Sequence, residues 1–336
     1  MDVSEVGEFG LIGRLAGLLA GVEGNDLANQ LAVGIGDDAA VWKANGLAVL
    51  ATTDTMVEGV HFLAGKTPWR DIGWKALAVN VSDIAAMGGT PEYALATLAL
   101  PEGARVEDIE ELYQGLGEAC LAYRVVVAGG DVVRAPVFSI TIALTGRAEL
   151  DAAGEPLVLR RDAAVAGDLV AVTGALGGAA GGLRALREGR EGAAALVQRH
   201  LRPQARVAAG KAALAAGVRC AIDVSDGLLQ DLGQVCRASR LGAVVWRDKL
   251  AIDPALTRTF DADEALELAA TGGEDYELLV TGAQTQLDEL ARRIDLPVTV
   301  IGEIVIQADH RAALLDENAK EIALPQAGWD HLRKRG

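Results

Sequence analysis

The feature of the sequence that most constrains its fold is an alternation of short apolar runs with longer segments of helical periodicity. In the first half, the runs Tyr93–Leu100 and Phe138–Leu144 are typical of strands, and Trp69–Met87 and Val106–Tyr123 are typical of helices. Two further strand candidates are Leu47–Ala51 and Val125–Ala128, and residues Ser4–Leu19 form an initial helix candidate. This alternation predicts an α/β domain with a mostly buried sheet.

The alternation breaks near residue 147 and then resumes. Residues 148–168 are rich in Asp, Ala, Arg and Gly and have no clear period. Beyond them the strand candidates are Leu169–Thr173, Cys220–Ile222, Ala243–Trp246, Glu277–Thr281 and Val298–Ile301. The helix candidates are Gly181–Glu188, Gln204–Ala216, Leu228–Ser239 and Leu287–Ile294. A chain of 336 residues is too long for one small core, so we predict two domains, residues 1–147 and 148–336.

Composition and charge exclude several classes of protein. Hydrophobic residues make up 51% of the chain and charged residues 23%, which predicts a folded protein rather than a disordered one. A net charge of −16 argues against nucleic acid or an anionic membrane as partner. An acidic chain that binds an anionic nucleotide needs metal cations between the two.

The sequence also indicates a location. The three cysteines are scattered and form no C-x-x-C pair, which is typical of reduced thiols in a cytoplasm. The first residues, MDVSEVGEFG, contain early acids and no basic region before an apolar core, so we expect no signal peptide. The most apolar long stretch, Leu169–Leu183, contains five glycines and is too short for a membrane span. We therefore predict a soluble, cytoplasmic protein.

Carboxylates beside glycine or small polar residues recur along the chain, most of them where an apolar run ends. They are Asp37 and Asp38 in GIGDDAA, Asp54 in ATTDT, Asp83 in VNVSDIAAMGG, Asp131 in VVAGGDV, Asp223 and Asp226 in IDVSDG, and Glu274 and Asp275 in TGGEDYEL. A single Asp of this kind is usually a turn or a helix cap, but here the same kind of position recurs six times. Few basic residues lie nearby in sequence, and clustered carboxylates are costly unless they are paired or bound to metal. The set predicts a phosphate site with several metal ions.

The donor type selects the metal. Carboxylates together with the hydroxyls of Thr52, Thr53 and Ser225 suit Mg²⁺ rather than zinc, and the four histidines are widely separated. The chain contains no G-x-x-x-x-G-K-[ST] loop and no G-x-G-x-x-G after a strand. The glycine-rich stretch GALGGAAGGL, residues 174–183, either cradles phosphate with its N–H groups or allows close helix packing, and the sequence leaves both interpretations open.

The motifs, in their order along the chain, match a known family. GEFGLI, GDDAAV, TTDTMVEGVHF, WKALAVNVSDIAAMGG, AGGDVV, IDVSDGL and GGEDYELL closely resemble those of the thiamine-monophosphate kinases. That family belongs to the superfamily of aminoimidazole-ribonucleotide synthetase and selenophosphate synthetase. The resemblance runs from Gly7 to Trp329, nearly the whole chain.

The resemblance implies a fold and a set of site residues. The fold is an N-terminal α/β domain, whose sheet joins that of its partner in a homodimer, followed by a C-terminal α+β sandwich. The implied Mg²⁺ ligands are Asp38, Thr52, Thr53, Asp54, Asp83, Asp131, Asp223 and Asp226. The implied ATP contacts are Tyr113, Gly130, Asp131, Arg161 and Ser225, and the implied contacts to thiamine monophosphate are His61, Glu274 and Trp329.

The resemblance also implies an activity, the ATP-dependent phosphorylation of thiamine monophosphate to thiamine diphosphate with release of ADP. This is the last step of thiamine diphosphate biosynthesis. The acceptor is already a phosphate oxyanion, so we expect in-line transfer assisted by several Mg²⁺ ions and no catalytic acid or base. The alternatives are another ATP-using enzyme of the superfamily with a different small substrate, or a non-catalytic regulator that binds Mg²⁺ and nucleotide.

Two departures from the family pattern affect local detail. The family usually has R-x-G-A where this chain has Arg161-Asp-Ala-Ala, and Asp-Ser where this chain has Gly178-Ala179. Neither departure replaces an implied metal ligand.

Overall fold

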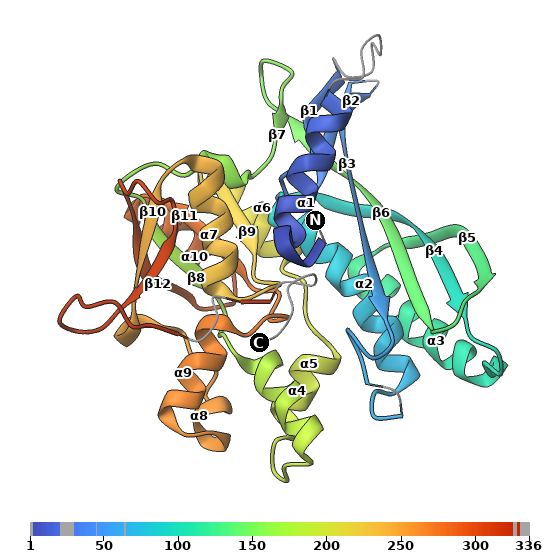
Figure 1. Cartoon of the computed structure of the whole chain (residues 1–336). Coiled ribbons are helices and arrows are strands. Elements are labelled where there is room, and N and C mark those ends of the chain that lie inside the picture. The colour runs from blue at the N-terminus through green and yellow to red at the C-terminus, as the bar shows by residue number, and fades with distance from the viewer. Residues whose placement is uncertain (1–2, 21–29, 45, 64, 325–327, 330–336) are drawn as a thin grey trace.

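The computed structural model describes residues 3–20, 30–44, 46–63, 65–324 and 328–329, and it contains two sheets in two lobes (Figure 1). The first sheet consists of β1 (Leu31–Val33), β2 (Ala40–Ala44), β3 (Leu47–Val57), β4 (Thr90–Leu100), β5 (Val126–Arg134), β6 (Ser139–Leu150) and β7 (Pro156–Leu157). The second consists of β8 (Leu169–Thr173), β9 (Cys220–Asp223), β10 (Gly242–Trp246), β11 (Leu278–Gly282), β12 (Val298–Val305) and β13 (Ala312–Leu315).

Ten α-helices of the described residues accompany the sheets. They are α1 (Val3–Ala20), α2 (Trp69–Ala86), α3 (Val106–Tyr123), α4 (Gly178–Glu188), α5 (Ala194–Leu201), α6 (Val207–Ala215), α7 (Leu228–Ser239), α8 (Leu256–Thr259), α9 (Ala262–Thr271) and α10 (Gln284–Arg293). No helix in the described part of the chain is both long and apolar enough to cross a membrane.

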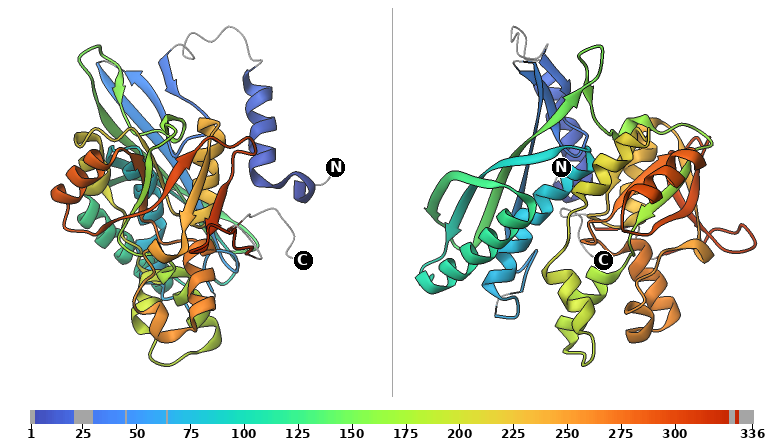
Figure 2. Two further views of the ribbon diagram at one scale, coloured as in Figure 1. Left: turned by 90° about the vertical axis from the view of Figure 1, so that its left-hand side faces the viewer. Right: turned by 180° about the vertical axis from the view of Figure 1, so that it is seen from behind.

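The first sheet has the strand order β1-β2-β3-β6-β4-β5, with β7 beside β6. β4 and β5 are parallel and are joined through α3, as a parallel pair requires a crossover. Helices α2 and α3 cover one face (Figure 2), and Leu50 of β3 is buried beneath them. The other face leaves Tyr93 and Leu95 of β4 more than half exposed.

Helix α2 joins the two lobes and is buried along most of its length. Against α3 it packs so closely that a Cβ on Gly73 would lie 1.9 Å from the Leu112 carbonyl oxygen. At its other end, Ala86 belongs to the same buried cluster as Ala213 of α6 and Ala221 of β9. The helix therefore touches the first sheet, α3 and the second lobe at once.

The second sheet has the order β13-β10-β12-β8-β11-β9 and is covered on both faces. Side chains alternate along each strand, so Val170 and Val172 of β8 enter the core beneath α7 and α9. Ala171, between them, enters the core beneath α6 and α10. Together the two sheets confirm the predicted class, α/β followed by α+β.

Several predicted elements need correction. β3 was predicted to end at Ala51 but continues to Val57, and β5 continues past Ala128 to Arg134, so Asp54 and Asp131 lie within strands rather than after them. β1, β2, β7, β13, α5, α8 and α9 were not predicted. The predicted domain boundary after residue 147 falls inside β6, and the division at that point stays a prediction.

Candidate active site

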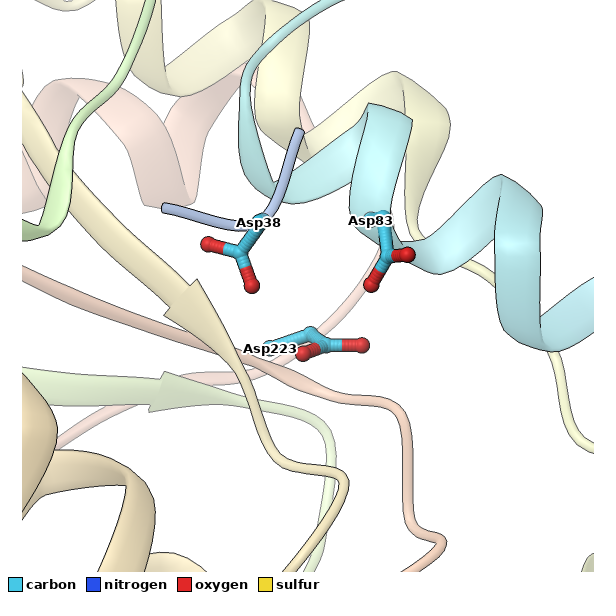
Figure 3. Close-up of side chains that lie close together, drawn as sticks. All are labelled: Asp38, Asp83 and Asp223. Carbon is cyan, nitrogen blue, oxygen red and sulfur yellow. The ribbon is translucent and has the colours of Figure 1, made fainter. Parts of the chain in front are cut away.

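Three carboxylates from distant parts of the chain meet where the lobes join. Asp38 lies between β1 and β2, Asp83 lies on α2, and Asp223 is the last residue of β9. One carboxylate oxygen of each lies within 4.8 Å of the others, and the three side chains point toward one another (Figure 3). Two elements of the first lobe and one strand of the second therefore build one acidic cluster, which we call the aspartate cluster.

Neighbouring polar side chains fix the aspartate cluster. The Thr52 hydroxyl donates to Asp83 Oδ2 at 2.5 Å, and the Ser82 hydroxyl donates to Asp223 Oδ2 at 2.6 Å. Asn80, one turn earlier on α2, accepts a hydrogen bond from the backbone N–H of Asp54. Sequence reasoning did not single out Ser82 or Asn80, although polar residues on an otherwise apolar helix are a readable pattern.

The aspartate cluster carries more negative charge than the protein neutralises. Burial raises the pKa of Asp83 well above its ordinary value, and the carboxylates of Asp54, Asp223 and Asp38 raise it further. The pKa of Asp223 is raised to about 8, mainly by burial and next by Asp38. These shifts mean that the ionised carboxylates are stable together only beside a cation.

Arg161 supplies one such cation. Its Nη2 lies 2.6 Å from Asp38 Oδ1 and its Nε lies 3.2 Å from Asp38 Oδ2, which is a bidentate pair. Nη1 also donates to the amide oxygen of Gln234. Arg161 was predicted as an ATP contact, which stays a prediction, and in this structure it is paired with the predicted metal ligand Asp38.

The loop after β9, residues 224–227, is held by hydrogen bonds to Asp231. One oxygen of this buried carboxylate accepts the backbone N–H groups of Ser225, Asp226 and Gly227 at 3.0–3.1 Å. On its other side the loop binds the C-terminal segment, because the Trp329 N–H donates to the Asp226 carbonyl at 2.9 Å. The loop thus brings together three predicted site residues, Ser225, Asp226 and Trp329.

Glu274 lies beside the same loop. Its N–H donates to the Ser225 carbonyl at 2.8 Å. Its carboxylate lies between two buried basic groups, with Oε1 2.7 Å from Lys75 Nζ and Oε2 2.9 Å from His200 Nδ1. Lys75 and His200 were not predicted as site residues; a lysine within the apolar run WKALAV was the available clue.

Two N–H groups of the glycine-rich stretch at the start of α4 are already bonded within the protein. The Asp275 carboxylate accepts the N–H groups of Gly177 at 2.6 Å and Ala179 at 3.0 Å. Gly182 lies so close to α5 that a Cβ there would meet the Leu196 carbonyl oxygen at 2.0 Å. Of the two interpretations that the sequence left open, helix packing fits this arrangement.

Thr53, Asp131 and Gly130 are not brought to the aspartate cluster. Thr53 and Asp54 are consecutive on β3, so the Thr53 side chain points to the opposite face from that of Asp54, and the Thr53 hydroxyl donates to the Ile142 carbonyl. Asp131 is on β5, three strands from β3, which places it roughly 14 Å away at the usual strand spacing. A Cβ on Gly130 would meet the Ala96 carbonyl oxygen at 1.8 Å, so strand packing is by itself a sufficient reason for glycine at this position.

Two predicted contacts lie at the edges of the first lobe. Tyr113 is 41% exposed on α3. His61 follows β3, and its Nδ1 accepts the Val57 N–H at 3.0 Å. A pocket of about 310 Å³ lies beside this segment, between Glu58 and Trp69, and none of its lining residues belongs to the aspartate cluster.

The aspartate cluster fits Mg²⁺. The donors are carboxylate oxygens with a hydroxyl, Thr52, directly behind them. Oxygen donors of this kind suit a hard divalent cation. The raised pKa values of Asp83 and Asp223 are the second sign, because burial and then the neighbouring carboxylates disfavour the ionised forms, which a bound cation would stabilise.

Comparisons with known proteins agree with the fold. Residues 36–148 match the family model for the N-terminal domain of AIR synthase related proteins, and residues 165–314 match that for the C-terminal domain. The architecture and the aspartate cluster between its halves thus define a two-domain protein of the AIR synthase related class.

Closer relatives are kinases. The chain is 36% identical to the thiamine-monophosphate kinase of Escherichia coli (strain K12), over 97% of this chain and 98% of that one. It is 34% identical to the Bacillus subtilis (strain 168) enzyme of the same name, over 90% and 94%. The solved structure of AaThiL complexed with AMPPCP and TMP has a TM-score of 0.83 at 33% identity and covers 98% of this chain and 99% of that chain. The chain belongs to the thiamine-monophosphate kinase family, a family of enzymes, as its motifs predicted.

Proposed function

We propose that this protein transfers the γ-phosphate of ATP to thiamine monophosphate and releases thiamine diphosphate and ADP. The observation that carries the proposal is the aspartate cluster, in which Asp38, Asp83 and Asp223 come within 4.8 Å from three elements and two lobes. A site that binds two polyanions needs such a cation-binding centre between them. Family membership supplies the identity of the two substrates.

Asp38, Asp83 and Asp223 would hold Mg²⁺, and Asp54 and Thr52 lie at the same place. Bound Mg²⁺ would screen the charges of the two substrates from each other and stabilise the charge on the phosphoryl group during its transfer. The protein's contribution is alignment. Asp231 fixes the loop of Ser225 and Asp226, and Arg161 is held in place through Asp38 and Gln234.

The acceptor contacts are proposed on the second lobe. Trp329 is bonded to the Asp226 carbonyl, which places the indole-bearing residue directly beside the loop that follows the aspartate cluster. An indole face there suits the cationic thiazolium of thiamine. Glu274, bonded to Ser225, is the matching carboxylate for the aminopyrimidine.

We also propose a homodimer and a cytoplasmic location. β5 is an edge strand, and its residues Val126 and Val132 are 57% and 63% exposed. An exposed apolar edge of this kind is suited to pairing with a second copy. In such a dimer the partner chain would add to the surroundings of Thr53, Gly130 and Asp131. The three cysteines are free thiols, in keeping with a reducing compartment.

The test measures ADP release from ATP in Mg²⁺ under three conditions: with thiamine monophosphate, with thiamine, and without an acceptor. We expect ADP and thiamine diphosphate in equal amounts with thiamine monophosphate alone, because free thiamine lacks the anionic group and its hydroxyl needs a base. Equal ADP release under all three conditions would contradict the proposal. If no ADP is released with either acceptor, but the protein binds nucleotide in Mg²⁺, the result would instead support the non-catalytic regulator.

A further inference from the structure

We infer that Lys75 and His200 are positioning residues, which hold the Glu274 carboxylate in place. The carboxylate then selects an acceptor that presents an N–H donor, such as the amine of an aminopyrimidine. The inference rests on the proposed function, in which Glu274 contacts the acceptor. It adds two residues from outside the GGEDYEL motif, Lys75 on α2 and His200 on α5.

The contacts around Glu274 leave its carboxylate partly open. Lys75 and His200 each approach one oxygen, at 2.7 and 2.9 Å, and their side chains are 3% and 1% exposed. The Glu274 side chain itself is 23% exposed. An ionised carboxylate has about four lone-pair sites, so two buried neighbours leave acceptor capacity on the exposed side.

The nearby Glu277 shows what a purely structural pair looks like in the same segment. Arg206 donates to both Glu277 oxygens, at 2.7 and 2.5 Å, and the Thr173 hydroxyl donates to one of them. The Glu277 side chain is only 2% exposed, so no face remains for a ligand. The two carboxylates lie three residues apart, and the Glu274 side chain is the more exposed of the two.

The backbone also points to a functional role for Glu274. Glu274 and Tyr276 have φ angles of 69° and 51°, a left-handed conformation that is costly for residues other than glycine. The conformation is held by two hydrogen bonds to the loop after β9, from Glu274 N–H to Ser225 and from Tyr276 N–H to Val224. These two bonds keep Glu274 beside the loop, where its carboxylate meets Lys75 and His200.

The two neighbours of Glu274 act differently, Lys75 as a charge and His200 as a neutral contact. Burial acts against ionisation of Glu274, and the opposing charge of Lys75, followed by the contact with His200, holds its pKa below the ordinary value. The pKa of His200 is lowered, by burial first and then by Lys75 and Arg187, so its imidazole is neutral at pH 7. The 2.9 Å contact between Nδ1 and the Glu274 carboxylate fits the neutral tautomer that carries its proton on Nδ1. Glu274 is therefore an anion, which can accept a hydrogen bond and cannot donate one.

The variants for the test are Lys75→Met and His200→Leu, with His200→Asn as the conservative replacement that keeps an N–H near the position of Nδ1. Arg206→Met is the matched control, because it breaks a buried pair in the same segment that faces no ligand. For each variant the KM values for thiamine monophosphate and ATP are measured beside the thermal melt. A second acceptor carries oxygen in place of the pyrimidine amine, which replaces the exocyclic N–H donor by a carbonyl acceptor.

We expect Lys75→Met to raise the acceptor KM about tenfold or more and leave the ATP value within about twofold. We also expect it to lose most of the wild-type preference for the amine over its oxygen analogue. His200→Leu should act in the same direction and His200→Asn should recover most of the loss. Arg206→Met should lower only the melting temperature. If Lys75→Met does not fold, Glu274→Gln, which keeps the shape, should lose the same preference.

Two results would overturn the inference. One is a Lys75→Met enzyme that behaves as Arg206→Met does, with a lower melt and an unchanged acceptor preference. The other is a rise of both KM values together. A wild-type protein that forms no thiamine diphosphate would instead reject the proposed function, so the two failures are distinguishable.

Discussion

Asp83 is the residue through which α2 enters the aspartate cluster. Its carboxylate accepts the Thr52 hydroxyl and is surrounded by three other carboxylates, those of Asp38, Asp54 and Asp223. Its charge is unfavourable in the metal-free protein and useful only when a cation is bound. Function and stability therefore make opposite demands at this position.

Replacing Asp83 by Asn should separate these demands. Turnover should fall by about 10²–10³, the usual cost of losing one preorganised electrostatic contact. The metal-free protein should melt at the same temperature or higher, because burial and the neighbouring carboxylates favour an uncharged side chain at this position, which Asn provides. The rise in melting temperature on adding Mg²⁺ should shrink. Asp288→Asn, on the exposed surface of α10, is the control and should change none of these values; near-normal turnover of Asp83→Asn would exclude Asp83 as a metal ligand.

At this scale the sequence predicted the acids and not their partners. Asp38, Asp83 and Asp223 were recognisable because each stands beside small residues in a short motif. Lys75, His200 and Asp231 were not, because their roles depend on contacts between residues far apart in sequence, such as Lys75 with Glu274. The pairing of Arg161 with Asp38, 123 residues apart, was equally invisible.

Among the elements, the contact between α2 and α3 depends on glycine. A Cβ on Gly115 would lie 1.7 Å from the Arg70 carbonyl oxygen, and one on Gly73 would lie 1.9 Å from that of Leu112. The two helices thus approach each other through a reciprocal pair of glycines, and the position of α2 against the sheet follows from that approach.

Gly115→Ala should therefore push the helices apart and lower the free energy of unfolding by about 1–3 kcal/mol or more, as overpacking does. Gly117 lies two residues further along the same helix, and a Cβ there would have no neighbouring atom within 4 Å. Gly117→Ala should be neutral or stabilise by up to about 1 kcal/mol, because alanine is the better helix former. Urea unfolding of the two variants makes the comparison. Equal effects would mean that helix propensity, and not packing, decides.

How well an element could be predicted depended on its periodicity and length. α3 and α7 were predicted with the observed bounds, and each is long enough, at 18 and 12 residues, to show a helical period. α9 was missed although Asp261 and Glu264 form a capping box at its start, which is a readable signal. β1 and β2 were missed because runs of three and five residues with mixed burial carry too little pattern.

For the whole molecule, the balance of protons links stability to pH and metal. The pKa values of Asp37 and Asp275 are both raised to about 7, in each case mainly by burial, and that of Asp223 is raised to about 8. In the unfolded chain the pKa of an Asp is about 3.9. The folded, metal-free protein therefore binds more protons than the unfolded chain between about pH 4 and pH 8, and this stabilisation is lost as pH rises through 7 to 8.

In EDTA we accordingly expect the free energy of unfolding to fall between about pH 6.5 and pH 8.5, by up to about 1.4 kcal/mol per pH unit for each excess proton. The window begins at about 6.5 because the lowered pKa of His200 acts in the opposite direction below that value. Saturating Mg²⁺ should raise the melting temperature most at the alkaline end of this range. A metal-free protein that gains stability across the range would show that these carboxylates are already ionised without metal.

The order of the two domains and their class followed from the sequence, but the way they meet did not. The alternation of runs indicates which segments are strands, whereas the approach of α2 to α6 and β9 depends on small residues such as Gly210, whose Cβ would lie 1.9 Å from the Ala85 carbonyl oxygen. Nothing local in the sequence marks such a contact.

The burial of α2 bears on how this protein can diverge. One helix carries Asp83, Asn80, Ser82 and Lys75, and its remaining faces are occupied by α3, the sheet and the second lobe. A library of random variants should contain few functional substitutions between residues 69 and 86. Acquiring a new acceptor would then require changes elsewhere, in the segments of Glu274 and Trp329, while α2 is inherited unaltered.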